Sequence, residues 1–110
     1  MENETTIEYI QQTYNTYLTN LPEGCQSIAK AFSDLRIEDG YDLIMSFTEG
    51  IEWLQSVRQR IPVDFPELEL KEALQQLLYE LECQNFMLII SLFSKKIPEI
   101  IKKSSLYNIQ

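Results

Sequence analysis

The sequence predicts an all-α fold, an antiparallel bundle of about five helices within a single domain of 110 residues. Apolar residues recur at helical spacing in every long segment, whereas alternation with a period of two is scarce. The chain has only 3 glycines and 4 prolines, and 45% of its residues are hydrophobic, which is typical of a compact helical chain. The segment 86–101 is apolar on nearly all sides, so other helices or a partner must cover it.

Signals for helix ends divide the chain into five predicted helices. Asn20 is expected to end the first helix, because the residue before a proline avoids helical geometry, and Pro22 suits the first turn of the next. The polar stretch 36–40, with its Asp-Gly pair, predicts a tight turn, and the two prolines within 61–66 predict an extended connector. Asn85 is the expected N-cap of the last helix. The predicted helices cover residues 6–19, 22–35, 41–60, 67–82 and 86–103, with loose tails at 1–4 and 104–110.

Two residues inside the predicted helices carry further structural predictions. Gly50 costs about 1 kcal/mol relative to alanine in a helix interior, so we expect a neighbouring helix to approach closely there. Pro98 falls within the helical pattern of the last segment and predicts a kink near Ser94 and Lys95.

A faint internal echo relates the two predicted helical hairpins, 22–60 and 67–103. The stretch 41–47 lines up with 86–92, and each follows an amphipathic segment and a short polar turn. Duplication of one hairpin would produce this echo, and similar packing demands alone would also produce it. Two copies are too few to indicate a repeat array.

Neither catalysis nor cofactor binding is predicted. The chain has no histidine, which removes the commonest general base and the commonest metal ligand. Its glycines stand singly, so no glycine-rich phosphate loop is present. Glu49 and Glu52 lie one helical turn apart and could share a cation, but such pairs usually form a solvated helix face. We therefore predict a protein that is not an enzyme, with no catalytic residue, no metal and no cofactor.

Charge and hydropathy restrict the partners and the location. The net charge of −8 argues against nucleic-acid binding, because phosphate contacts need clustered lysines and arginines. The acidic start is unlike a secretory signal, and the longest apolar run, 86–90, is too short to span a bilayer. Cys25 and Cys83 stand among apolar residues, which predicts buried free thiols in a reducing cytoplasm; whether they ever pair stays open. We expect a cytoplasmic protein that binds neither membranes nor nucleic acid.

A protein-interaction function is what these exclusions leave. Leu88 and Leu92 lie off the main apolar stripe of the last helix, and Trp53 lies at the edge of its helix seam, so these three are the candidate protein-binding residues. The leading hypothesis is a chaperone or adaptor that binds a partner helix in an apolar groove, with a homodimer as a variant. The alternative hypothesis is an acidic inhibitor or mimic that occupies a basic protein site or a nucleic-acid-binding site, with binding that weakens steeply with salt.

The sequence EGIEWL at 49–54, the leucine-rich helix 67–82 and NFMLI at 85–89 resemble a family of small uncharacterised α-helical proteins from Gram-positive bacteria. The resemblance covers about residues 25–103 and implies a bacterial protein, but no activity and no site residues. The order of short antiparallel helices is similar in outline to the flagellar export chaperone that holds flagellin. That similarity implies a chaperone role by analogy of architecture alone.

Overall fold

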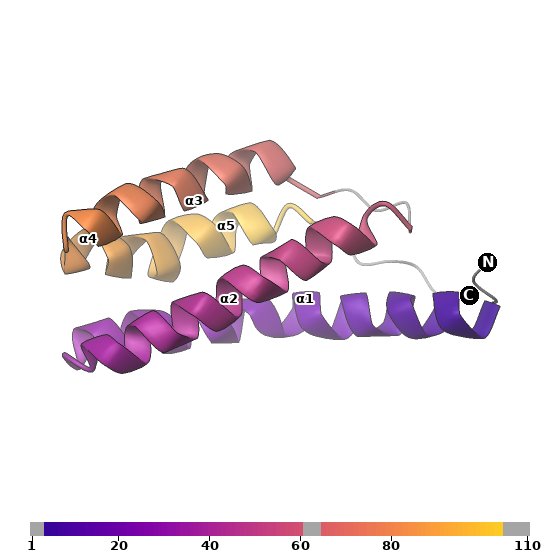
Figure 1. The fold of residues 1–110 in the computed structure, drawn as a ribbon, viewed down its shortest axis with the longest axis horizontal. Coiled ribbons are helices and arrows are strands. Elements are labelled where there is room, and N and C mark those ends of the chain that lie inside the picture. The colour runs from indigo at the N-terminus through magenta and orange to yellow at the C-terminus, as the bar shows by residue number, and fades with distance from the viewer. Residues whose placement is uncertain (1–3, 61–64, 105–110) are drawn as a thin grey trace.

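The computed structural model describes the backbone of residues 4–60 and 65–104, and this part of the chain is an all-α bundle without strands (Figure 1). The predicted fold class is confirmed, with four helices rather than five. The elements are α1 (Glu4–Ser33), α2 (Ile37–Val57), α3 (Glu67–Glu82) and a C-terminal helix made of α4 (Phe86–Ser91), the π-helical η1 (Leu92–Lys96) and α5 (Ile97–Ile101).

The first two predicted helices, 6–19 and 22–35, are a single helix in the structure, and Pro22 lies inside it. Proline has no N–H to donate to the carbonyl four residues earlier, so the residues around Pro22 by themselves predict a boundary between two helices. The buried side chains of α1 nevertheless follow one another at spacings of four and three across the proline: Tyr14, Leu18, Leu21, Cys25, Ile28 and Phe32. Burial of this single stripe favours one continuous helix.

The predicted turn at 36–40 is wrong in position, because the chain turns between α1 and α2 at residues 34–36. Leu35 adopts the left-handed conformation, with φ of 63°. The Arg36 N–H donates to the Ala31 carbonyl at 2.8 Å, and the Leu35 N–H donates to the Phe32 carbonyl at 3.1 Å. This pair of bonds is a Schellman motif, which satisfies carbonyls at the end of α1.

Gly40 belongs to α2 and not to a turn. A Cβ atom at this position would lie 2.7 Å from a ring carbon of Phe32. The absent side chain therefore lets the end of α1 and the start of α2 approach closely. This role explains a glycine where an Asp-Gly turn was expected.

The turn between α3 and α4 repeats the first turn. Gln84 has φ of 54°, and the Asn85 N–H donates to the Glu80 carbonyl at 2.9 Å. The Asn85 side chain accepts a hydrogen bond from the Leu88 N–H at 3.4 Å, so the predicted N-cap is confirmed. When the two turns are aligned in sequence, residue 37 corresponds to residue 86. The echo instead aligns residue 41 with residue 86, a register that differs by four positions. The origin of the two hairpins stays open.

The kink expected near Ser94 takes the form of the π-helical turn η1. The Ile97 N–H donates to the Leu92 carbonyl, five residues back. Pro98 has no N–H, and its ring would crowd the Ser94 carbonyl in a regular α-helix, so a locally widened turn is a physical solution. The widened turn places both Phe93 and Ile97 in the core.

The C-terminal helix lies between α1 and α3, and α2 packs against α1 (Figure 1). Ring contacts join the two hairpins, because Phe32 stacks on Phe86 with centroids 5.7 Å apart and Phe47 meets Phe93 edge to face at 5.4 Å. Residues 1–3 and 105–110 of the predicted tails and residues 61–64 of the predicted connector lie outside the described residues, whereas Glu4 belongs to α1. The arrangement leaves one side of the α1–α2 pair uncovered by the C-terminal helix.

Candidate functional site: a groove between α1 and α2

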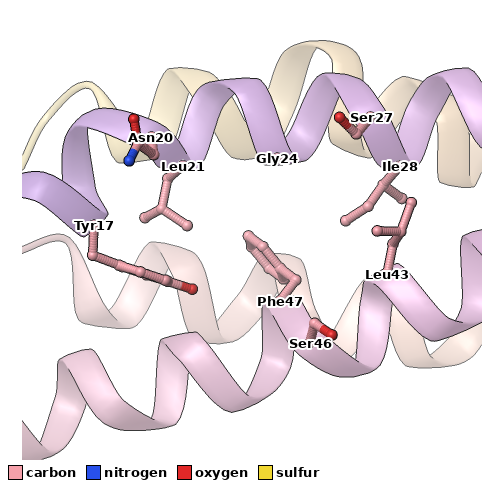
Figure 2. A pocket seen from close by; sticks show the side chains of 9 residues that line it. All are labelled: Tyr17, Asn20, Leu21, Gly24, Ser27, Ile28, Leu43, Ser46 and Phe47. Atoms are coloured by element: carbon pink, nitrogen blue, oxygen red, sulfur yellow. The ribbon is translucent and has the colours of Figure 1, made fainter.

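Helices α1 and α2 enclose an open, mostly apolar groove of about 270 Å³ (Figure 2). It extends over three turns of α1 and one turn of α2. Its lining residues are Tyr17, Asn20, Leu21, Gly24, Ser27 and Ile28 from α1, and Leu43, Ser46 and Phe47 from α2.

The groove has an apolar floor and a polar rim. Leu21, Ile28 and Phe47 form the floor and are at most 6% exposed. In Figure 2 the Phe47 ring reaches from α2 toward α1 beneath Gly24. Asn20, Ser27 and Ser46 are exposed at the rim, and Leu43 is 37% exposed. A ligand in this groove would bury apolar surface and meet uncharged hydrogen-bonding groups at its edges.

Gly24 is an exposed lining residue that leaves open space in the groove. It lies one helical turn from both Leu21 and Ile28, on the stripe that faces α2, and a Cβ atom there would meet nothing within 4 Å. The space that a side chain would occupy is therefore empty. The other two glycines differ, because a neighbouring aromatic ring fills the equivalent space at each.

Tyr17 closes one end of the groove. Its ring and hydroxyl lie directly over Gly50 of α2, so the close approach predicted at Gly50 is confirmed, and an α1 side chain makes it. The ring also meets Trp53 edge to face, with centroids 6.0 Å apart. Burial, with a smaller effect of the nearby Cys25, raises the pKa of Tyr17 above its usual 10.0. The phenol is therefore a neutral hydroxyl at neutral pH.

The structure separates the three predicted protein-binding residues. Trp53 is half-buried and borders the groove through Tyr17. Leu88 is 42% exposed on α4, whose first residue, Phe86, stacks on Phe32 of α1. Leu92 is only 3% exposed and belongs to the core, so it does not contribute to an exposed surface.

Sequence reasoning missed the residues that form the groove itself. The available signal was Gly24, which follows Leu21 by three residues and precedes Ile28 by four and so falls on the face of α1 that lines the groove. The predicted break at Pro22 concealed that phase, because it placed residues 17 and 24 on different helices.

The net negative charge of the chain is concentrated in the two helices that form the groove. Residues 4–57 contain nine acidic and two basic side chains, a formal charge of −7, whereas residues 58–104 contain seven of each. The two basic residues lie at the α1–α2 turn. There Lys30 pairs with Asp34 at 3.4 Å, and Arg36 pairs with Asp39 at 3.3 Å.

Acidic residues also lie along both edges of the groove. On α2, Asp39, Asp42 and Glu49 share with Ser46 a stripe of three- and four-residue spacings, and Ser46 lines the groove. On α1, Glu23 lies between the lining residues Asn20 and Ser27 in the same manner. All four carboxylates are exposed. The groove is thus apolar inside and negatively charged along its edges.

Other candidate chemistry gains no support from geometry. Glu49 and Glu52 are exposed, and residues 4–60 and 65–104 contain no cluster of three or more potential metal ligands. Cys25 is buried as predicted, but Cys83 is exposed at the end of α3, so that prediction is wrong for Cys83. Within the described part of the chain, no helix has the length and apolarity needed to cross a membrane.

The model of one protein family, the domain of unknown function DUF8042, matches residues 9–106. The chain belongs to the DUF8042 family. The match contains every groove residue and is in line with the expected membership of an uncharacterised helical family. Neither the curated proteins nor the solved structures include a match to this DUF8042 chain.

Proposed function

We propose that this protein is a non-catalytic protein-interaction module that binds one helix of a partner in the α1–α2 groove. The observation that supports the proposal most directly is the open space at Gly24 above an apolar floor. Helix-in-groove recognition uses such a surface, with apolar anchors of the bound helix at spacings of three and four.

The dimensions of the groove favour side chains over a whole small-molecule ligand. Its volume of about 270 Å³ is below the roughly 300–1,000 Å³ of pockets that enclose drug-sized molecules. Along α1 it extends from Tyr17 to Ile28, a distance of about 16 Å at the helical rise per residue. Two or three anchors of an amphipathic helix, spaced over two turns, match that length.

The lining also favours binding over catalysis. Tyr17 is its one ionisable side chain, and burial raises the pKa of that phenol, which therefore stays protonated at neutral pH. The other polar lining groups are the Asn20 amide and the Ser27 and Ser46 hydroxyls. The Ser27 hydroxyl already donates to the Glu23 carbonyl at 3.1 Å.

Within this proposal, the protein acts as a chaperone or adaptor in the cytoplasm of a Gram-positive bacterium. The outline similarity to flagellar export chaperones is consistent with such a role, although it concerns architecture alone. Trp53 belongs to the proposed site as the residue that supports Tyr17. Leu88 lies outside the groove, and it serves as a control position.

The charge distribution favours a second candidate, an acidic inhibitor of a basic surface. The −7 charge of residues 4–57 would suit that role without any use of the groove. The two candidates differ in what they require. An inhibitor of this kind would bind equally well with the groove filled, whereas the interaction module would not.

Filling the groove tests the proposed function. A displayed library of 18-residue amphipathic helices would be selected for binding to the protein. Each peptide has fixed leucines at spacings of three and four and randomised flanks. Gly24→Leu places a side chain in the open space, and Gly24→Ala is the matched control with a single added carbon. We expect selected peptides to bind Gly24→Leu at least tenfold more weakly than the wild type, while Gly24→Ala and Leu88→Asp lose much less. Selection of no peptide that distinguishes Gly24→Leu from the wild type would overturn the proposal.

A further inference from the structure

We infer that the occupant of the α1–α2 groove is a basic amphipathic helix, whose apolar face enters the groove and whose lysines and arginines flank that face. This inference rests on the proposed function and adds the chemistry of the partner. It follows from the position of the charges and not from the net charge alone.

Carboxylates lie along both edges of the groove. On the α2 side, Asp42 and Glu49 flank the lining turn 43–47, and Asp39 lies three residues before Asp42, beside the α1–α2 turn. On the α1 edge, Glu23 lies between Asn20 and Ser27, both of which line the groove. A helix in the groove would therefore present each of its two flanks to negative charge.

Most of these edge carboxylates have no ion-pair partner among the residues that the structure describes. The basic side chains of the hairpin, Lys30 and Arg36, pair with Asp34 and Asp39 at the turn. Glu23, Asp42 and Glu49 form no ion pair with the described residues. Approach of a neutral or acidic helix would leave these charges uncompensated, whereas lysine or arginine on the partner would pair with them.

The two edges are unequal, and this difference predicts the charge pattern of the partner. The stripe beside the groove on α2 carries three acidic residues, whereas the one on α1 carries the acidic Glu23 and the basic Lys30. The flank of the bound helix that faces α2 should therefore carry more basic residues than the opposite flank. A neutral apolar helix has no reason to show this asymmetry.

The inference is tested by the flanking residues of peptides that are selected on the wild type. Peptides that also bind Gly24→Leu are removed by counter-selection. We expect enrichment of lysine and arginine at the randomised flanks, with more on one flank than on the other. We also expect affinity to fall several-fold between 50 and 300 mM NaCl, because exposed charge pairs are screened by salt.

Two charge-reversal variants with the same change in net charge provide the matched comparison. Asp42→Lys/Glu49→Lys alters the α2 edge, and Glu72→Lys/Glu82→Lys alters exposed positions on α3. We expect the first variant to weaken the selected peptides at least tenfold at 50 mM NaCl, and the second to weaken them less than threefold. Thermal unfolding of both variants checks that each is folded.

The outcomes separate this inference from the proposed function. Two results would overturn the inference of a basic partner helix but not the proposed function. One is the selection of groove-dependent peptides with neutral or acidic flanks, and the other is an equal effect of the two variants. Selection of no groove-dependent peptide would overturn both. Self-association that Gly24→Leu abolishes would identify a second copy as the occupant and would also contradict the inference.

Discussion

At the scale of single residues, Gly24, Gly40 and Gly50 all lie inside helices but have different surroundings. The Phe32 ring occupies the space beside Gly40, and the Tyr17 ring occupies the space beside Gly50. The space beside Gly24 is empty. The sequence predicted close packing only at Gly50, because a glycine in a helical pattern does not show which partner faces it.

Alanine substitutions at the three glycines should separate these surroundings. Gly40→Ala and Gly50→Ala each force an aromatic ring to move, and overpacking of this kind costs about 1–3 kcal/mol. Gly24→Ala adds no contact and should raise the free energy of unfolding by up to about 1 kcal/mol, through helix propensity. Urea denaturation measures all three. Equal effects at positions 24 and 40 would contradict this account of the glycines.

The buried thiol of Cys25 predicts how stability depends on alkaline pH. Burial raises the pKa of Cys25 from 9.0 to about 12, so the unfolded chain loses this proton at lower pH than the folded chain. The free energy of unfolding should be unaffected by this group below pH 9 and should fall as the pH rises from 9 toward 12. Burial also raises the pKa values of Tyr14 and Tyr17, which act in the same direction.

Urea titrations of the wild type, Cys25→Ala and the exposed-site control Cys83→Ala between pH 7 and 11 measure this effect. Cys25→Ala should show a shallower fall than the other two proteins. A fall of the same steepness in all three would exclude Cys25 as a cause.

At the scale of helices, the sequence predicted some elements well and others poorly for identifiable reasons. The bounds of α3 are those expected, because Pro66 and the polar turn at 82–85 agree with the apolar pattern between them. Pro22 predicted a helix boundary, whereas the spacing of the apolar residues on both sides of it predicted one continuous helix. The structure has the continuous helix. Boundary rules concern neighbouring residues, whereas the continuity of α1 depends on burial against two other helices.

The turns that end α1 and α3 use leucine and glutamine where glycine is the usual residue. Left-handed φ values cost a non-glycine residue about 1–2 kcal/mol, and Leu35 is 80% exposed, so little packing offsets that cost. Leu35→Gly should raise the free energy of unfolding by about 1 kcal/mol, as measured by urea denaturation. Gln26→Gly, at an exposed position inside α1, should lower it by a similar amount. Destabilisation by Leu35→Gly would show that the leucine side chain makes a stabilising contact.

At the scale of the whole molecule, the apolar groove lies in a different place from the one that the sequence led us to expect. An apolar groove was expected from the excess of apolar residues, but the last helix was expected to provide it. Leu92 lies in the core because α1 and α3 flank the C-terminal helix on two sides. The groove depends on which helices are neighbours and on the phase of Gly24 relative to α2. Neither follows from the pattern of any single segment.

The negative charge and the apolar groove occupy the same two helices, while residues 58–104 of the sequence contain equal numbers of acidic and basic side chains. The exposed ion pair of Lys103 with Glu69, at 2.6 Å, links α3 to the end of the C-terminal helix. The α1–α2 pair thus carries the surface proposed for binding, and the C-terminal helix of the second hairpin packs against α1. This division of roles is what mapping of a bound peptide would test.

The most direct test of the central claim is a nitrogen-15 NMR titration of the protein with the tightest peptide from the selection. The account predicts that the largest amide shifts fall within residues 17–28 and 43–50, with the Gly24 amide among them. It also predicts that the same peptide leaves the spectrum of Gly24→Leu nearly unchanged. Shifts concentrated on α3 and α4 around Leu88, with the Gly24 amide unaffected, would contradict the assignment of the groove as the binding site.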